Sequence, residues 1–493
     1  MHSLELKNII LLIIMSIMFI ASYYVGVNLA STNFEEILFY SLSLDVVAEY
    51  GDNKPFFIAL KKCFFPIIIL FGLFFLLFSG ISDELTSSIY PLSFIQEHRG
   101  IIIILLLVLS LIILLNKIGL WNYLYYDMQK SNIIKDNYVD PKKAKVTFNK
   151  KRNLIMIFVE SLENSLFSKE HGGIWDYEVI NDLYELLNDK DAVSFFDSNS
   201  REGMHMIQGS SYTSSSVFAN NSGIPIKLSL KRKGFSKKKY IGGIYNLGDL
   251  LKDNGYTNEI ISAANTTYGG FKDFYIQHGD YNIIDTDSLK ENGFNINDKD
   301  KGDWGINDRC LFDIAKQRLD TLSKTNKPFN LQLITIDTHF IDGFIGDYSE
   351  TKFAKRYENV YATTSKLIKQ FVNYIKLQPY YKDTTIVIVG DHLIMQSDFM
   401  NDKMSKNRTV YNCIINPKNK DIKNKKRIYT ALDIYPTIVS ALGAEIKGNR
   451  LALGVNLFSK KKTLIEKNGF KKLNNELKKY SSFYNEEILQ VKK

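Results

Sequence analysis

Cysteine is scarce in this sequence, with 3 in 493 residues, and Cys63 lies within an apolar stretch. A disulfide framework is therefore not expected. Cys310 and Cys413 could form one disulfide in an oxidising compartment, but the sequence does not decide whether they pair. A metal site built from thiolates is also excluded, so any metal must be held by oxygen and nitrogen ligands.

The sequence also lacks internal repeats, low-complexity tracts outside its C-terminal lysines, and any nucleic-acid-binding motif. The formal net charge is +9, and lysines crowd the segments Lys227–Lys239 and Lys460–Lys493. Because no binding motif accompanies this charge, a nucleic-acid partner is not expected. Basic residues beside a membrane favour anionic lipid headgroups. For the C-terminal lysines, a solvated surface is an equally good interpretation.

Long apolar stretches are present near the N-terminus, at Ile9–Ala30, Cys63–Ser79 and Ile101–Leu115. A helix needs about 17–25 residues to span a bilayer, so the first stretch is long enough and the other two are short. Trp121 and three tyrosines after the third stretch resemble an interfacial belt. A cleaved signal peptide is the alternative for the first stretch, but no small-residue cleavage site follows it neatly. We expect about three transmembrane helices.

Charges that flank these stretches favour an N-terminus inside the cell. Lys7 precedes the first stretch, whereas Lys61 and Lys62 argue mildly for the opposite orientation. The loop after the first stretch carries the acidic residues Glu35, Glu36, Asp45, Glu49 and Asp52. Three spans from an inside N-terminus place the chain after residue 130 outside the cytoplasmic membrane.

In the second part of the chain, apolar runs alternate with segments of helical spacing. The predicted strands are Asn153–Val159, Phe329–Ile336, Thr384–Val389 and Thr409–Ile415. The predicted helices are Tyr245–Asn254, Lys352–Leu377 and Thr430–Leu442. This alternation predicts an α/β domain with a central, mostly parallel sheet flanked by helices. We expect a membrane domain (1–130), a linker (131–150), the α/β domain (151–460) and a lysine-rich tail (461–493).

Polar side chains that can bind a metal follow three of the predicted strands. Glu160 follows the first, Asp337 and His339 follow the second, and Asp391 and His392 follow the third. In an open α/β sheet, ligands bind beyond the carboxyl ends of the strands, so these side chains are expected to converge at one edge. Loop solvation explains any one of them, but it explains three strand ends less well.

A fourth segment supplies hydroxyl groups. In Gly209–Pro225, serines and a threonine precede a short apolar run that stops at Gly223, which predicts a short helix with hydroxyls at its N-terminus. Such a terminus favours anions like phosphate, and a hydroxyl that touches a metal there could act as a nucleophile. The alternative is an N-cap with surface serines. The residues alone do not choose among Ser210, Ser211, Thr213 and Ser214.

Carboxylate or hydroxyl oxygens combined with one imidazole suit a moderately hard divalent ion. Mn²⁺ is the first choice, with Zn²⁺ and Mg²⁺ as alternatives. Such an ion would lower the pKa of a bound hydroxyl and offset the charge on a transferring phosphoryl group.

Seven segments between about residues 150 and 460 carry a family resemblance. They are FVESLE (Phe158–Glu163), YTSSSVFANNSGIP (Tyr212–Pro225), LGDLLKDNGY (Leu247–Tyr256), WGINDRCLFDIA (Trp304–Ala315), LITIDTHFIDGF (Leu333–Phe344), GDHLIM (Gly390–Met395) and ALDIYPTIVSALG (Ala431–Gly443). In this order they resemble the membrane-anchored phosphoglycerol transferases of the alkaline-phosphatase/sulfatase superfamily. That branch includes lipoteichoic acid synthases and, as the nearer resemblance, phosphoglycerol transferases I.

The resemblance implies a role for each candidate residue. It places the nucleophile on Thr213 and the metal ligands on Glu160, Thr213, Asp391 and His392. His339 matches a histidine that contacts the phosphoglycerol group or activates the acceptor.

Four further residues have less direct roles under the resemblance. Trp304 and Asp308 match a substrate-pocket segment. Asp337 is expected to orient His339 or the metal ligands. Glu163 is expected to have a structural role only.

The activity implied by the resemblance is a phosphotransferase that moves glycerol phosphate from phosphatidylglycerol to a glycan acceptor. The enzyme would sit in a bacterial inner membrane as a multi-pass protein, with its catalytic domain facing the periplasm or cell exterior. Tyr212 stands where the nearer branch has Trp, and Asn220, Asn221 and Ser222 replace its small-Gln-Cys pattern, which leaves the acceptor open. The sulfatase nucleophile, a Cys or Ser followed by Pro and Arg, is absent, so sulfatase activity is disfavoured.

Three alternatives remain open from the sequence. A phosphoethanolamine transferase acting on lipid A or a glycan uses the same kind of site, although such relatives carry several disulfides. A polymerase that builds a polyglycerolphosphate chain differs only in its acceptor. A non-catalytic membrane scaffold of the same fold would bind no metal.

Overall fold

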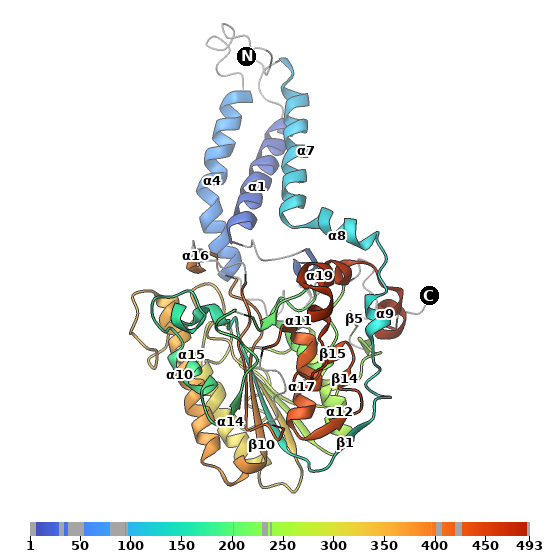
Figure 1. The fold of residues 1–493 in the computed structure, drawn as a ribbon. Helices are drawn as coiled ribbons and strands as arrows, with labels where there is room; N and C mark the ends of the chain where they lie inside the picture. Colours follow the sequence, from blue (N-terminus) through green and yellow to red (C-terminus); the bar gives the residue numbers. More distant parts are fainter. Residues whose placement is uncertain are drawn as a thin grey trace. The chain divides into compact units, whose positions relative to one another are not determined.

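The computed structural model describes residues 6–28, 34–37, 54–78, 94, 97–200, 202–228, 235–236, 239–395, 397–400, 407–419 and 426–490. The chain divides into two compact units, an N-terminal unit within residues 1–125 and a C-terminal unit of residues 126–493 (Figure 1). Most of the basic segment Lys227–Lys239, and the acidic residues Asp45, Glu49 and Asp52, lie outside the described residues.

The N-terminal unit is helical. Its long helices are α1 (Leu6–Asn28), α4 (Lys54–Phe78) and α7 (Arg99–Lys117), and the short helix α8 is Leu120–Asp127. Within the described residues, α7 is the one helix that is long and apolar enough to cross a membrane, while 7–23 and 63–78 are shorter apolar stretches. The prediction of about three spans is therefore supported for one helix and not confirmed for the other two.

The surface of α7 is apolar on most sides. Ile103 packs in a small core with Leu12 and Met15, but Ile101 and Leu105 are 66% and 62% exposed. A helix that exposes this much contiguous apolar surface is typical of a membrane or protein contact.

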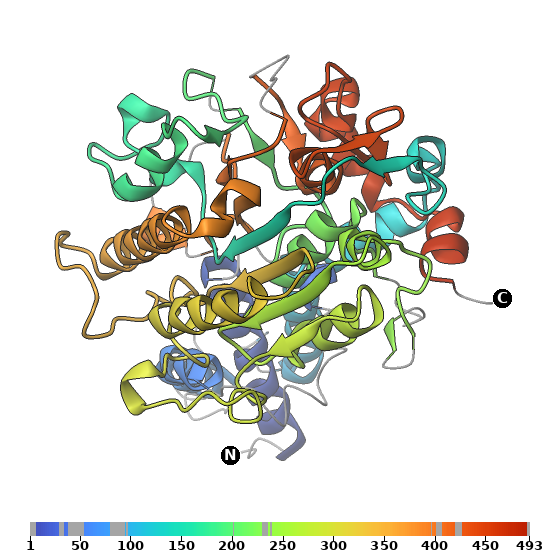
Figure 2. The same ribbon diagram turned by 90° about the horizontal axis from the view of Figure 1, so that it is seen from below.

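The C-terminal unit contains a central seven-stranded sheet with the order β3-β11-β10-β2-β9-β7-β8 (Figure 2). The strands are β2 (Asn153–Val159), β3 (Ala192–Val193), β7 (Thr257–Ser262), β8 (Asn282–Ile284), β9 (Phe329–Ile334), β10 (Thr384–Gly390) and β11 (Asn412–Ile415). The five strands from β10 to β8 are parallel, and β11 runs antiparallel to both of its neighbours. The predicted α/β class and mainly parallel sheet are confirmed, with β11 making the sheet mixed.

Alternating side chains of the strands fill two cores, one on each face of the sheet. On β2, Leu154 and Phe158 pack into one core, while Ile155 and Val159 pack into the other. Both faces are apolar because both are covered by helices, as expected for a parallel sheet. One face is covered by α11 (Thr213–Ser222), α12 (Leu247–Asp253) and α17 (Ile434–Ala441), and the other by α10 (Asn181–Leu187), α14 (Asp308–Leu322) and α15 (Arg356–Lys376).

The segment 461–493 is not a solvated tail where the structure describes it. It forms α18 (Leu464–Asn468) and α19 (Phe470–Lys478), and Leu473 and Leu477 are buried in the core that contains α11. The lysines between these leucines obscured the pattern, because two apolar residues four apart already make a helix face that can pack. The predicted linker 131–150 likewise contributes β1 (Val146–Phe148), which pairs with β13 (Ala444–Ile446).

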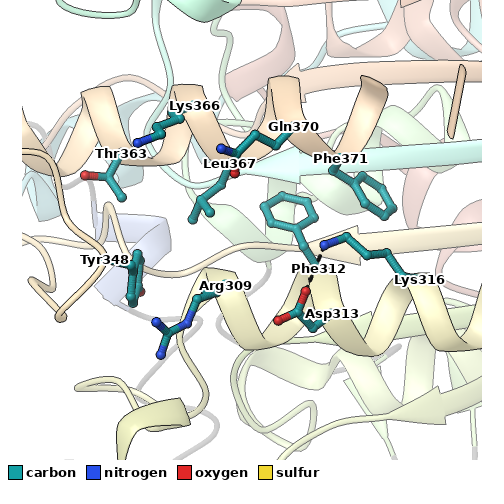
Figure 3. Close-up of a pocket in the computed structure, with 10 residues that line it drawn as sticks. All are labelled: Arg309, Phe312, Asp313, Lys316, Tyr348, Thr363, Lys366, Leu367, Gln370 and Phe371. Carbon is teal, nitrogen blue, oxygen red and sulfur yellow. Dashed lines mark hydrogen bonds and ion pairs between the residues drawn. The ribbon is translucent and has the colours of Figure 1, made fainter. Parts of the chain in front are cut away.

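Helices α14 and α15 leave a groove of 460 Å³ between them (Figure 3). Phe312 and Phe371 lie inside it with ring centroids 5.0 Å apart. The cationic side chains that line the groove are each paired with a carboxylate: Arg309 with Asp347, Lys316 with Asp313, and Lys366 with Glu350. The groove is therefore polar but close to neutral.

Strand register brings the ligand-bearing loops together. Val159 pairs with Gly390 at the ends of β2 and β10, so Glu160 and Asp391 leave the sheet from adjacent positions. Phe158 pairs with Ile334 of β9 on the other side, which carries the segment 335–339 to the same edge.

Candidate active site

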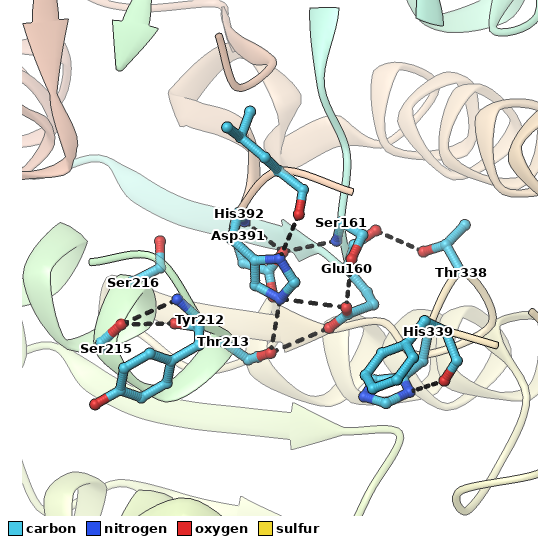
Figure 4. Close-up of polar contacts among 12 residues, drawn as sticks. Glu160, Ser161, Tyr212, Thr213, Ser215, Ser216, Thr338, His339, Asp391 and His392 are labelled. Carbon is cyan, nitrogen blue, oxygen red and sulfur yellow. Dashed lines mark hydrogen bonds and ion pairs between the residues drawn. The ribbon is translucent and has the colours of Figure 1, made fainter. Parts of the chain in front are cut away.

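Glu160, Asp391 and His392 form a buried cluster at the carboxyl edge of the sheet (Figure 4). The His392 Nε2 atom lies 3.3 Å from Glu160 Oε1 and 3.6 Å from Asp391 Oδ2. One ligand atom from each of the three residues lies within 4.8 Å of the others. Three strand-end residues predicted to converge are thus brought to one point by the fold.

Thr213 is the hydroxyl residue that contacts this cluster. Its Oγ1 lies 3.2 Å from Glu160 Oε2 and 3.3 Å from His392 Nε2, and its side chain is partly exposed. Ser214, the next residue, points elsewhere, since its Oγ is buried without a hydrogen-bond partner among the described residues. Of the four candidate hydroxyls, Thr213 is therefore the one that the structure records at the cluster.

Helix α11 presents Thr213 at its first turn. The Tyr212 N–H donates to Ser215 Oγ, which in turn donates to the Tyr212 carbonyl, so the helix start is closed by its own third residue. The helix ends at Gly223, whose φ of +68° is the left-handed conformation that suits glycine. Free N–H groups in the first turn favour an anion next to Thr213.

A buried amide pair anchors the other end of α11 to the sheet. Gln332 of β9 donates through Nε2 to Asn221 Oδ1 over 2.8 Å, and Tyr275 donates to Gln332 Oε1 over 2.8 Å. Both amides are buried, so their hydrogen bonds fix helix and strand in one arrangement. A glutamine in the middle of an apolar strand was the one weak sequence signal for this contact.

Backbone groups hold Asp391 from one side. Its Oδ1 accepts from the Ser161 N–H over 2.7 Å and from the His392 N–H over 2.6 Å. Ser161 has a φ of +52°, an uncommon conformation for a residue with a side chain, and this turn points its N–H at Asp391. The second carboxylate oxygen, Asp391 Oδ2, is buried and has no hydrogen-bond partner among the described residues.

His392 and Glu160 are oriented in the same way by neighbouring groups. His392 Nδ1 lies 2.9 Å from the Leu393 carbonyl, which can only accept, so Nδ1 carries a proton and Nε2 faces the cluster. Glu160 Oε1 accepts from Ser161 Oγ over 2.7 Å, and the Glu160 carbonyl accepts from Thr338 Oγ1 over 2.6 Å.

The electrostatics of the cluster call for a cation. Burial, reinforced by the Glu160 carboxylate, raises the pKa of Asp391 to about 8. Burial opposes protonation of His392, but the Asp391 and Glu160 carboxylates outweigh it and raise the pKa of His392 to about 10. Burial also opposes ionisation of Glu160, yet the His392 imidazole holds the pKa of Glu160 well below its usual range. Two carboxylates buried at one point are favoured only with positive charge beside them.

The donor set fits a divalent metal ion. It offers two carboxylates, one imidazole nitrogen and one hydroxyl, and the unpartnered Asp391 Oδ2 is a buried oxygen that a cation would satisfy. Hard oxygen ligands with one nitrogen suit Mn²⁺, Zn²⁺ or Mg²⁺, and the geometry does not choose among them.

His339 lies beside the cluster on the loop after β9. Its Nδ1 is 2.6 Å from the Phe340 carbonyl, so Nδ1 carries a proton and Nε2 is left to accept one. Burial lowers the pKa of His339, which favours the neutral ring. The Trp304 ring lies against it with centroids 4.6 Å apart, so the structure brings these two predicted substrate-side residues together.

Asp308 has a different position from the one predicted. It was expected to contact substrate, but it is fully buried, and its Oδ1 accepts from the Ile336 and Asp337 N–H groups over 2.8 and 3.3 Å. Asp337 Oδ2 in turn accepts from the Tyr348 hydroxyl over 2.5 Å. Through these hydrogen bonds, the two carboxylates position the backbone that leads to His339.

Glu163 takes part in a buried ion pair that the sequence did not reveal. Arg408 Nε lies 3.0 Å from Glu163 Oε1, and the Ile394 N–H donates to Glu163 Oε2 over 2.9 Å. Arg408 also donates to the Ile394 carbonyl over 2.8 Å. The pair therefore fixes the loop that follows His392, which agrees with the structural role expected for Glu163.

Cys310 and Cys413 are not joined by a disulfide in the described structure. Cys310 is buried on α14 and Cys413 is buried on β11. Burial raises the pKa of each thiol to about 12, so both are unreactive, protonated thiols.

Comparison with known proteins assigns the family. The fold is an α/β sheet flanked by helices, with a candidate metal site and a hydroxyl at the carboxyl edge of the sheet. The family model described as Sulfatase matches residues 152–444, which is more than half of the chain. The protein therefore belongs to the sulfatase family.

Two curated relatives are similar to part of the chain. The chain is 30% identical over 272 residues to phosphoglycerol transferase I of Salmonella choleraesuis and 31% identical over 272 residues to that of Escherichia fergusonii. Each match covers 53% of this chain and 33% of the relative, so the chain spans about a third of the length of these relatives. The lipoteichoic acid synthase LtaP from Listeria monocytogenes is similar in structure, with 19% identity, a TM-score of 0.49, and coverage of 66% of this chain and 81% of that one.

Proposed function

We propose that the protein transfers glycerol phosphate from phosphatidylglycerol to a glycan acceptor through a covalent intermediate on Thr213. The observation that carries this proposal is the position of Thr213 Oγ1, 3.2 Å from Glu160 Oε2 and 3.3 Å from His392 Nε2 at the start of a helix. The relatives named phosphoglycerol transferase I support phosphoglycerol as the group that is transferred.

Four residues would hold the metal: Glu160, Thr213, Asp391 and His392. A divalent ion bound there would lower the pKa of the Thr213 hydroxyl and would place positive charge beside the phosphoryl group. Mn²⁺ is the ion we propose, with Zn²⁺ and Mg²⁺ as alternatives.

In the first step, Thr213 Oγ1 attacks the phosphorus of phosphatidylglycerol. The bond between phosphorus and the diacylglycerol oxygen breaks, and that oxygen takes the proton that Thr213 Oγ1 gives up. Diacylglycerol is released and a glycerophospho group stays on Thr213. The free N–H groups at the start of α11 favour the negative charge that develops on the phosphoryl oxygens.

In the second step, an acceptor hydroxyl attacks the same phosphorus and Thr213 leaves. We assign to His339 Nε2 the removal of the proton from that hydroxyl and its delivery to Thr213 Oγ1. The contact of Nδ1 with the Phe340 carbonyl and the lowered pKa of the buried ring support this role. Trp304 packs against His339 and limits its rotation.

The membrane part of the proposal rests on the N-terminal apolar helices. We propose a multi-pass protein of a bacterial inner membrane, with the catalytic unit facing the periplasm or cell exterior. The lipid donor and the apolar exposed surface of α7 both favour attachment to a bilayer.

Replacing Thr213 tests the chemistry. Thr213→Ala should abolish diacylglycerol release from phosphatidylglycerol vesicles, whereas the control Ser214→Ala, which removes the neighbouring hydroxyl, should retain it. Mass spectrometry of the wild-type protein after incubation should find a glycerophospho adduct on Thr213. Undiminished release by Thr213→Ala would overturn the proposal, and an adduct formed only from phosphatidylethanolamine would assign phosphoethanolamine transfer instead.

A further inference from the structure

A second cavity, of 480 Å³, lies near the site on the C-terminal unit. Its apolar lining consists of Leu289, Phe294, Ile296 and Ile306. Leu289 and Ile306 are buried in the core on that face of the sheet, while Phe294 and Ile296 pack on that core and remain partly exposed. The volume falls in the range of about 300–1,000 Å³ that is typical of ligand pockets.

The cavity adjoins the residues that face the substrate. Gly305 and Ile306 line it, and they directly follow Trp304, whose ring contacts His339. The Ile306 N–H donates to the Ala263 carbonyl over 2.9 Å, which ties this segment to the residue after β7. The cavity therefore lies at the same carboxyl edge of the sheet as the metal ligands.

Both charged side chains that line the cavity are lysines, and each has an acidic neighbour in the sequence, Glu291 or Asp300. The exposed side chains of Lys290 and Lys301 both line it. Lys290 has no ion-pair partner in the part of the chain that the structure describes, and Lys301 is paired with Asp298. The two charges of that pair offset each other, as do those of the ion pairs in the groove between α14 and α15.

An apolar cavity of this volume matches a hydrocarbon chain. We propose that it holds an acyl chain of the phosphatidylglycerol donor, beside the segment that carries Trp304. This inference rests on the proposed function and adds that the catalytic unit itself recognises the lipid tail. Burial of apolar surface lowers the free energy, so a long chain binds there better than a short one.

Chain-length selectivity tests the proposal in the full-length protein. We would compare phosphatidylglycerol with palmitoyl chains, presented in mixed micelles, and with hexanoyl chains in solution. Phe294→Asp places a charge in the cavity at a partly exposed position, so the fold should tolerate it. We expect this variant to raise KM for the palmitoyl lipid about tenfold and to change KM for the hexanoyl lipid less than about twofold.

A matched variant controls for a general effect of an added charge. Leu367→Asp introduces the same charge at a partly buried position in the groove between α14 and α15, and both lipids should be turned over as by the wild type. Equal losses for both lipids in Phe294→Asp, or no loss for either, would overturn the acyl-chain site. Normal turnover of the hexanoyl lipid by Phe294→Asp leaves the proposed transfer reaction intact in either case.

A binding measurement keeps the proposal testable without turnover. Phosphatidylglycerol carrying a diazirine in one acyl chain would be photolysed with the Thr213→Ala protein, and the adducts mapped by mass spectrometry. Labelling within residues 286–306, reduced in Phe294→Asp, is expected. Labelling confined to the N-terminal helices would overturn the site. If the wild type releases no diacylglycerol from either lipid, the proposed function is wrong. The photolabelling result would still show whether an acyl chain binds in the cavity.

Discussion

Two pairs of buried carboxylates lie behind the same edge of the sheet, and their surroundings differ. Glu160 and Asp391 share one imidazole, and Asp391 Oδ2 has no hydrogen-bond partner among the described residues. Asp308 and Asp337 face backbone N–H groups and the Tyr348 hydroxyl, although Asp337 Oδ1 is also buried without a hydrogen-bond partner among the described residues. The ligand atoms of the first pair are directed at a common point, whereas carboxylate oxygens of the second pair accept hydrogen bonds that position the backbone.

The difference shows that buried acidity does not by itself mark a metal site. Burial raises the pKa of Asp308 to about 6 and that of Asp391 to about 8. Hydroxyls reach both pairs, but only the Glu160 and Asp391 pair has an imidazole nitrogen beside its carboxylates in the described structure. The pair around Asp308 is a support for the His339 loop.

The largest effect is expected from removing a ligand charge. Asp391→Asn should lower diacylglycerol release by about a thousandfold or more, because metal assistance is worth several kcal/mol in the transition state. Calorimetry should show Mn²⁺ binding to the wild type and not to the variant. Added Mn²⁺ should raise the melting temperature of the wild type only. Equal Mn²⁺ affinity in both proteins would remove Asp391 from the ligand set.

A smaller effect, on stability rather than chemistry, is expected at the second pair. Asp308→Ala leaves the buried N–H groups of Ile336 and Asp337 without their acceptor, which should cost about 3 kcal/mol of unfolding free energy. Thermal melting would measure this loss, and Mn²⁺ affinity should stay within about threefold of the wild type. Asp313→Ala, at an exposed ion pair on the same helix, should change stability by less than about 0.5 kcal/mol. A loss of metal binding in Asp308→Ala without a loss of stability would contradict this division of roles.

The smallest effect concerns pH. The pKa of Asp308 is raised by burial from 3.8 to about 6, so its contribution to stability is full below its unfolded pKa and is lost as the pH rises through about 6. Asp308→Asn keeps an accepting oxygen and removes the titration. Melting temperatures measured between about pH 4 and pH 7, with a chelator present, should therefore fall less steeply in the variant. Parallel curves for the two proteins would show that another group controls this range.

Much of the sheet could be predicted because its strands are short, continuous apolar runs. Asn153–Val159 matches β2 residue for residue, and Thr384–Gly390 extends the predicted third strand by one residue. The convergence of Glu160, Asp391 and His392 follows from parallel strands sharing one edge, whatever their order. The choice of Thr213 among four hydroxyls came from resemblance, since spacing alone does not tell which hydroxyl faces the sheet.

The unpredicted features depend on contacts between distant parts of the chain. Arg408 meets Glu163, and Tyr348 meets Asp337, through loops whose paths are set by tertiary packing. Asp308 looked available because it opens a helix, and only the position of β9 shows that its carboxylate is covered. Two leucines among many lysines were too few to predict that the C-terminal segment packs as α19.

The pairing of β2 with β10 restricts how the length of this protein can vary. Glu160 and Asp391 directly follow the paired ends Val159 and Gly390. The position of each ligand therefore depends on the number of residues in its strand. Side chains alternate between the two faces of a strand, so deleting one residue within Thr384–Gly390 would turn Asp391 to the opposite side. A library of single-residue deletions should therefore show sharp intolerance through β10 and tolerance in the exposed stretch 324–327 between α14 and β9, where a lost residue is absorbed by the loop.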